Sequence, residues 1–274
     1  MIPNILSIAG SDPSGGAGIQ ADIKAISANG GYAMAVITAL TAQNTHGVGA
    51  VELVPPEMVK TQIAMIRADI RIDAIKIGML GTVGIIEAVA ESLRGLDVPI
   101  VLDPVMVAKG GDRLLAQDAV SALHTLLPLA SVITPNLPEA ADLLGVGEAA
   151  DVAAMRSQAR ALLALGPRAV LLKGGHLASP DSPDLLAWYD RFELIEGPRT
   201  VTRNTHGTGC SLSSALATEL GHGRPVLEAA RRAKAYVAAA IAAANALHVG
   251  GGHGPIHHFH AMAQFTPAQK DPTS

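Results

Sequence analysis

The sequence is poor in cysteine, in aromatic residues and in long apolar runs. It has one Cys, one Trp, three Tyr and three Phe among 274 residues, so Cys210 has no partner in the chain for a disulfide. No apolar run reaches the ~18 residues needed to span a bilayer. The N-terminus lacks the basic region, apolar stretch and cleavage site of a secretory leader. We therefore expect a soluble cytoplasmic protein that does not engage a membrane.

Charge of one sign is also scarce, since the net charge is only −4. No basic patch interleaved with aromatic residues is present, so no nucleic-acid partner is expected. A Gly-x-x-x-x-Gly-Lys-[Ser/Thr] segment is missing too, so any nucleoside triphosphate must be bound without a P-loop. The ligands are therefore expected to be small molecules.

What is abundant is aliphatic sequence, at 49% hydrophobic residues overall. Short apolar runs alternate with longer helical patterns, which is typical of repeated βα units. The residues at 184–203 alternate like a β-hairpin, and no linker divides the chain. The sequence predicts one α/β domain over residues 1–274, with a mainly parallel sheet flanked by helices and antiparallel strands at one edge. The expected parallel strands are 5–9, 33–38, 74–77, 100–102, 132–134 and 169–172.

Residues 204–210 hold two glycines and the only cysteine, directly before an alanine-rich helix. Gly207 and Gly209 allow the backbone amides of residues 207–210, including Thr208, to face a phosphate at the positive end of that helix. Cys210 would lie in the first helical turn, where the same field lowers the pKa of a thiol and favours thiolate. The alternative is a glycine-rich turn with a small buried cysteine.

Polar residues follow several predicted strands, and ligands of open α/β sheets bind beyond the carboxyl ends of the strands. Asp103, Asn136 and Glu139 fall there, and their hard oxygen atoms suit Mg2+. Helix capping is the other explanation for Asn136 and Glu139. Lys173 also ends a predicted strand, where it could hold a phosphate chain or simply be solvated.

The first predicted strand leads into a glycine loop, residues 10–18, and then a helix that carries Asp22. The segment Gly16-x-Gly18-x-x-Ala21 matches a dinucleotide fingerprint, but the acidic residue expected about 20 positions later is absent. A loop that approaches a small ligand, with Asp22 pointing toward it from the first helical turn, fits better. The alternative for Asp22 is a favourable charge at a helix start.

With these residues located, the chain resembles the hydroxymethylpyrimidine/phosphomethylpyrimidine kinases, a ribokinase-like family. The resemblance spans nearly the whole chain in several segments that follow the family's order: residues 9–22, 37–45, 76–80, 134–140, 173–176, 204–210 and 254–260. It implies a three-layer sandwich. The histidines at 257, 258 and 260 then belong to a family-typical ending and not to a metal site.

The resemblance also implies roles for individual residues. Those expected to line a pyrimidine pocket are Asp22, Gln43 and Met79, with Gly10, Ala17 and Val105 as neighbours. Those expected on the nucleotide and metal side are Lys173, Asn136 and Lys234 for the nucleotide, and Asp103 and Glu139 for Mg2+. The carboxamide of Gln43 can both donate to a ring nitrogen and accept from an amino group.

The activity implied is ATP- and Mg2+-dependent phosphorylation of 4-amino-5-hydroxymethyl-2-methylpyrimidine and then of its monophosphate, for thiamine biosynthesis. Many sugar kinases of this fold have Asp as the catalytic base where this chain has Cys210, which favours the pyrimidine-kinase branch. Such enzymes are commonly homodimers, so a homodimer is expected. The alternatives are a pyridoxal kinase, an NAD-dependent oxidoreductase and a non-catalytic pyrimidine sensor.

Overall fold

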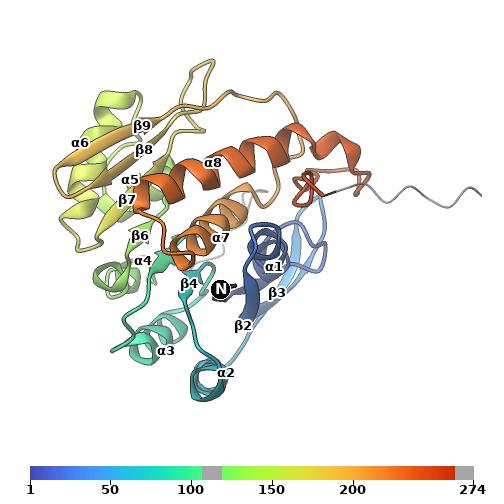
Figure 1. Ribbon diagram of the computed structural model, residues 1–274, viewed down its shortest axis with the longest axis vertical. Coiled ribbons are helices and arrows are strands. Elements are labelled where there is room, and N and C mark those ends of the chain that lie inside the picture. Colours follow the sequence, from blue (N-terminus) through green and yellow to red (C-terminus); the bar gives the residue numbers. More distant parts are fainter. Residues whose placement is uncertain (107–118, 263–274) are drawn as a thin grey trace, which may run out of the picture.

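A computed structural model describes residues 1–106 and 119–262. Its centre is one nine-stranded sheet, which helices flank (Figure 1). The strand order across the sheet is β3-β2-β1-β4-β5-β6-β7-β8-β9. The strands are β1 Asn4–Ser11, β2 Tyr32–Gln43, β3 Val48–Leu53, β4 Ala74–Ile77, β5 Ile100–Leu102, β6 Val132–Ile133, β7 Ala169–Lys173, β8 Asp184–Trp188 and β9 Arg191–Ile195.

The six central strands are parallel, and the edge strands are antiparallel. Strands β2, β1, β4, β5, β6 and β7 pair in parallel. Strands β8 and β9 form the expected hairpin, antiparallel to β7. The opposite edge also has an antiparallel strand, since β3 pairs with the second half of β2 through Ala39–Gln43. The predicted antiparallel edge is thus confirmed, and β3 adds a second one.

Helices cover both faces of the sheet, which confirms the three-layer sandwich. One face packs against α1 Gly18–Ala28, α7 Thr208–Gly221 and α8 Val226–Ala242. The other face packs against α2 Pro56–Asp69, α3 Val83–Leu93, α4 Ala119–Leu123, α5 Leu137–Leu144 and α6 Val152–Leu163. Neighbouring strand residues enter different layers, as Ile5 packs on the α7 side and Leu6 on the α3 side. Aliphatic residues supply nearly all of this core.

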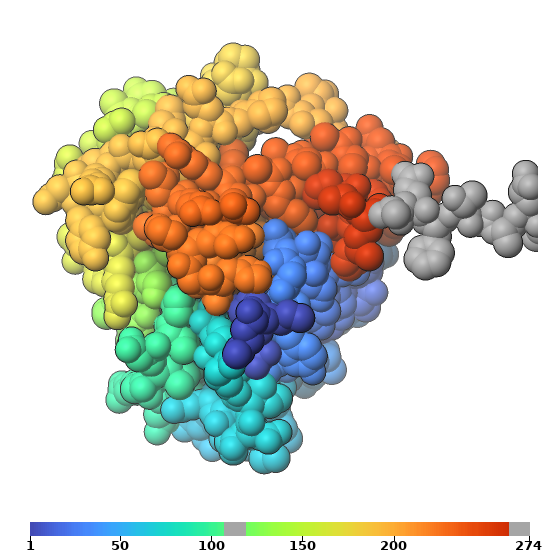
Figure 2. Space-filling model, viewed as in Figure 1, coloured from blue at the N-terminus to red at the C-terminus, as the bar shows by residue number. Residues whose placement is uncertain are grey.

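The C-terminal residues return to the first part of the chain. Residue Ile256 is fully buried, and the backbone amide of His257 donates to the carbonyl of Ala240. The backbone amide of His253 donates to the carbonyl of Thr45. Figure 2 shows this red segment against the blue N-terminal residues. The amide of His206 donates to the carbonyl of Gly254, and Gly207 packs against Gly16, so segments from both ends of the described chain enclose the loop before α7.

No helix in the described ranges is long and apolar enough to cross a bilayer.

Candidate active site

Most of the predicted site residues lie near the ends of β1, β2, β4, β5, β6 and β7 and at the start of α7, while Lys234 lies within α8. Some of them form three side-chain groups together with residues that were not predicted. One contains Asp103, Glu139 and Lys173, which we call the Asp103 cluster. A second is the buried pair of Asp22 and Lys76. The third joins Asp12, His206 and Gln43.

In the Asp103 cluster, residues of three different elements meet around one ammonium group. Lys173 Nζ lies 2.9 Å from Oδ1 of Asp103 and 3.8 Å from Oε2 of Glu139. Thr134 donates its hydroxyl to the same Asp103 oxygen at 2.8 Å. Glu139 and Asn136 also form a capping box, in which each side chain bonds the other's backbone amide at 2.8 Å. Capping and membership of the cluster are thus compatible roles for Glu139.

Burial and charge shift all three pKa values of the cluster. Burial raises the pKa of Glu139 to about 7, and the neighbouring Asp103 carboxylate adds to that shift while Lys173 opposes it. Burial acts in the same direction on Asp103, yet the ammonium groups of Lys173 and Lys76 hold its pKa below the usual range. Burial alone would lower the pKa of Lys173, but the two carboxyl groups raise it. A further cation that joins this oxygen-rich group would displace the proton from Glu139, and such a donor set fits Mg2+.

The glycine turn lies directly against this cluster. A Cβ atom at Gly209 would lie 3.3 Å from Lys173 Nζ and 3.5 Å from Oδ2 of Asp103. Gly207 caps α7 with a φ of 75°, and a Cβ there would come within 1.7 Å of the carbonyl oxygen of Gly16. The first amides of a helix have no partner within it. An anion bound by the amides of Gly209 and Cys210 would therefore also face the Lys173 ammonium.

The expected thiolate at Cys210 is wrong, because burial keeps the thiol protonated. Cys210 is the third residue of α7 and receives a hydrogen bond from the backbone amide of Gly18. Burial raises the pKa of the thiol to about 11, and the positive charge of Lys76 offsets only part of that rise. Desolvation of the charged form therefore dominates, and Cys210 carries its proton at neutral pH.

Asp22 is paired with a lysine that sequence reasoning missed. Lys76 Nζ lies 2.9 and 2.8 Å from the two carboxylate oxygens of Asp22, and both side chains are 0% exposed. Ser7 and Ser214 donate their hydroxyls to the same carboxylate at 2.6 and 2.8 Å. Asp22 lies in the second turn of α1 and not in its first, and its oxygens face this buried network and not an open cavity. Burial opposes a charge on Lys76, but Asp22 raises its pKa.

The other residues predicted for the pyrimidine pocket come to the same edge of the sheet. Gly10 lies in β1 beneath Met79, whose Sδ atom is 3.0 Å from the position of a Cβ at Gly10. Ala17 precedes α1 and donates its amide to Asp12 at 2.8 Å. Val105 follows β5, two residues after Asp103, and Gln43 ends β2. Their contacts with a pyrimidine stay a prediction.

Among the predicted nucleotide residues, Lys234 and Asn136 already have protein partners. Lys234 Nζ is 2.8 Å from the carboxylate of Asp184, which lies opposite Lys173 in the β7–β8 register. The side-chain oxygen of Asn136 accepts from the amide of Glu139. Asn136 forms a parallel backbone bridge with Lys173. The nucleotide contacts of Asn136 and Lys234 stay a prediction.

The dinucleotide interpretation of the first loop conflicts with its surroundings. A Cβ atom at Gly16 would lie 2.3 Å from Cδ2 of His206, so an imidazole ring already packs on this glycine. His206 Nε2 lies 2.9 Å from Oδ2 of Asp12 and 3.4 Å from Nε2 of Gln43. The loop is thus folded around a buried Asp12–His206 pair, which the sequence did not indicate.

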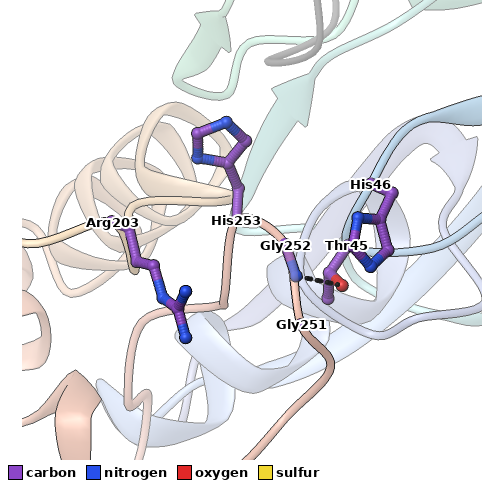
Figure 3. Close-up of a pocket in the computed structure, with 6 residues that line it drawn as sticks. All are labelled: Thr45, His46, Arg203, Gly251, Gly252 and His253. Carbon is purple, nitrogen blue, oxygen red and sulfur yellow. Dashed lines mark hydrogen bonds between the residues drawn. The ribbon is translucent and has the colours of Figure 1, made fainter.

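A shallow pocket of about 310 Å³ lies outside this predicted set (Figure 3). Thr45 and His46 follow Gln43 by two and three residues, and Arg203 immediately precedes the glycine turn. The amide of Gly252 donates to Thr45 Oγ1 at 3.1 Å, as the dashed line shows. The remaining lining residues are Gly251 and His253. The pocket marks the outer side of the junction between the C-terminal residues and the loop after β2.

Solved structures with this architecture are kinases of small molecules. The chain matches an ADP complex of Bacillus subtilis pyridoxal kinase with a TM-score of 0.87 and 38% identity, covering 94% of this chain and 98% of that one. It matches Clostridium difficile phosphomethylpyrimidine kinase with a TM-score of 0.77 and 42% identity, covering 86% and 97%. The protein therefore has the fold of the ribokinase-like small-molecule kinases.

Sequence comparison places the chain within this class. The model of the family described as phosphomethylpyrimidine kinase matches residues 12–257. The hydroxymethylpyrimidine/phosphomethylpyrimidine kinases of Salmonella typhimurium and Escherichia coli are 53% and 51% identical, over 94% of this chain and 98% of each relative. The chain belongs to the phosphomethylpyrimidine kinase family.

Proposed function

We propose that the protein transfers the γ-phosphate of ATP to the hydroxymethyl group of 4-amino-5-hydroxymethyl-2-methylpyrimidine. A second transfer to the resulting monophosphate gives the pyrophosphate used in thiamine biosynthesis. Relatives that bear the name of both activities are just over 50% identical over nearly the whole chain. The observation that carries the proposal is the contact between the glycine turn and the Asp103 cluster, which joins helix-terminal amides to an ammonium and two carboxyl groups.

In this mechanism the amides of residues 207–210 and the ammonium of Lys173 stabilise charge on the transferred phosphoryl group. Mg2+, held by Asp103 and Glu139 directly or through water, would neutralise charge on the ATP phosphates when bound. Such transfer depends mainly on positioning and charge stabilisation, so a strong base is not required. Because Cys210 carries its proton at neutral pH, we assign it the role of positioning the attacking oxygen and not that of a base.

Replacement of Cys210 tests this assignment. In Cys210→Ala we expect kcat for the pyrimidine to fall with little change in KM for ATP, because the turn amides and Lys173 stay in place. Cys210→Ser, which keeps a small donor at this position, is the matched control and is expected to retain more activity. Steady-state kinetics with a coupled ADP assay separate these effects. Unchanged turnover in both variants would remove Cys210 from the reaction.

Pyridoxal kinase is the second candidate function, because the pyridoxal kinase complex gives a TM-score of 0.87. Pyridoxal also presents a hydroxymethyl group on a flat aza-aromatic ring. The higher sequence identity to the pyrimidine kinases favours the pyrimidine. A competition assay with the two compounds at equal concentration decides the order of kcat/KM. A preference for pyridoxal would replace the first proposal.

We further propose that the chain is one kinase domain that acts in the cytoplasm as a homodimer. Exposed apolar residues on the β2–β3 edge support an interface, since Leu40, Val51 and Leu53 are 52%, 41% and 38% exposed. Sedimentation of the protein and of a Val51→Lys variant tests the dimer. A monomeric mass for the unaltered protein at micromolar concentration would exclude it.

A further inference from the structure

The pair formed by Asp12 and His206 is buried next to the only predicted substrate residue that has a carboxamide. Asp12 is 2% exposed and His206 is 6% exposed. The carboxylate of Asp12 accepts from the backbone amides of Ser14 and Ala17 at 2.9 and 2.8 Å, so it also shapes the loop that holds Ala17. His206 belongs to the glycine turn. One buried hydrogen-bonded pair thus joins the substrate loop to the catalytic turn.

The Asp12 carboxylate determines which ring nitrogen of His206 carries a hydrogen. Oδ2 of Asp12 is 2.9 Å from Nε2 of His206, and a carboxylate can only accept. Hydrogen bonds from the ring and from the loop hold the pKa of Asp12 below its usual value, even though burial acts against them. Whether the imidazole is neutral or charged, it can hydrogen-bond to this carboxylate through Nε2 only if Nε2 carries a hydrogen. Nε2 of His206 is therefore a donor.

The NH2 group of Gln43 would then face the Nε2–H group of His206, which is also a donor. Nε2 of Gln43 lies 3.4 Å from Nε2 of His206, and Oε1 of Gln43 lies 3.3 Å from Oγ1 of Thr41. The Thr41 hydroxyl has one hydrogen, and it donates to the carbonyl of Ser11 at the shorter distance of 2.8 Å. Thr41 can therefore only accept from Gln43. A half-turn of the carboxamide exchanges its oxygen and nitrogen without moving any other atom, gives Thr41 a donor, and removes the donor–donor contact. The amide oxygen then faces the Nε2–H that His206 donates mainly to Asp12, as the longer branch of a shared hydrogen bond.

We infer that His206, held by Asp12, is a positioning residue that fixes the Gln43 carboxamide with its oxygen toward His206 and its NH2 group toward Thr41. This rests on the proposed function. The pyrimidine presents an amino group beside a ring nitrogen, so a carboxamide binds it with two hydrogen bonds, as Gln binds adenine. If the oxygen and nitrogen of the Gln43 amide were exchanged, the pyrimidine would have to bind in a flipped orientation to pair with them. Its hydroxymethyl group would then point to the opposite side of the pocket. His206 thereby sets the direction in which the hydroxymethyl group points.

Nuclear magnetic resonance of the ligand-free protein tests the orientation without any substrate. In a sample with 15N-labelled His and Gln, the His206 Nε2 signal is expected to be that of a protonated ring nitrogen. The Gln43 NH2 protons are expected to show contacts to the Thr41 side chain. A bare Nε2 on His206, or Gln43 amide protons in contact with the His206 ring, would overturn the inference. Absence of pyrimidine turnover would instead count against the proposed function only.

Kinetics test the consequence for the substrate. His206→Phe keeps the ring and removes the donor, and kcat/KM for the pyrimidine is expected to fall about ten- to hundred-fold with KM for ATP unchanged. His206→Gln, whose terminal NH2 can serve both Asp12 and Gln43, is expected to recover most of that loss. His222→Phe is the matched control, because His222 Nε2 bonds the carbonyl of Asn29 at 3.1 Å, away from the site.

A double variant separates positioning from a general structural role. In a Gln43→Ala background, His206→Phe is expected to add almost nothing to the loss in pyrimidine kcat/KM. The same fold-loss with and without Gln43, or an equal rise in KM for ATP, would show that His206 acts otherwise and would overturn the inference. A thermal melt of each variant identifies any that is not folded, and the resonance test then decides.

Discussion

Replacement of Lys76 by Met should destabilise the protein strongly, because it leaves the Asp22 carboxylate buried without its cation. At a separation of 2.8 Å and an effective dielectric constant of about 20, the attraction between the two charges is about 6 kcal/mol. The cost of burying the two ions together is of similar size, so the intact pair adds little net stability. Removal of one partner alone is expected to cost about 3–5 kcal/mol.

Urea denaturation followed by circular dichroism measures this change in the free energy of unfolding. Lys60→Met is the matched control, since Lys60 Nζ also lies 2.8 Å from a carboxylate oxygen, that of Glu91, but on the surface. That variant should differ little from the unaltered protein. The double variant Lys76→Met with Asp22→Asn should recover much of the loss, because Ser7 and Ser214 can donate to or accept from an amide. Equal losses in the Lys76 and Lys60 variants would refute the argument.

Two further predictions concern the start of α7. Gly207→Ala should abolish activity and cost more stability than Gly223→Ala: both glycines have positive φ, but a Cβ has open space at Gly223 and strikes the Gly16 carbonyl at Gly207. We expect about 1–2 kcal/mol for Gly223→Ala in a denaturation experiment, and equal losses would contradict the clash. His258 Nε2 lies 2.9 Å from the Ser211 hydroxyl oxygen. Burial lowers the pKa of His258 to about 4. As the pH falls, His258 is protonated in the unfolded chain before it is protonated in the folded protein. The free energy of unfolding should therefore fall by up to about 3 kcal/mol between about pH 6.5 and about pH 4. The His258→Asn variant should show a smaller fall over the same range.

The layers of the fold were predictable because periodicity records burial. Each central parallel strand is a short apolar run followed by a helical pattern, and the structure has a strand at each of those positions. Strand β3 was missed because five of its six residues, from Gly49 to Leu53, are exposed, so no buried face produces an apolar pattern. Pairing with the long β2 creates this strand, and pairing is a tertiary property.

The site was predictable where residue type and strand end coincide, as at Asp103 and Lys173. The role of Lys76 was not predictable, because a lysine between two isoleucines in a strand is expected to point to solvent. Its partner Asp22 lies 54 residues earlier in the chain. The protonated Cys210 was missed for a related reason, since the helix terminus is visible in sequence while the depth of burial is not. Both failures concern charges whose cost depends on the folded surroundings.

The enclosure of the glycine turn by both ends of the chain has a consequence for biosynthesis. Asp12 meets His206 across 194 residues, and Asp22 meets Ser214 across 192. Contacts so distant in sequence form late in folding. While the protein is being synthesised, the N-terminal loop and the parallel strands leave the ribosome long before α7 and the C-terminal residues that enclose the turn. The amide of His206 can reach the carbonyl of Gly254 only after the segment around Ile256 has been made, so the surroundings of the glycine turn are completed late in synthesis.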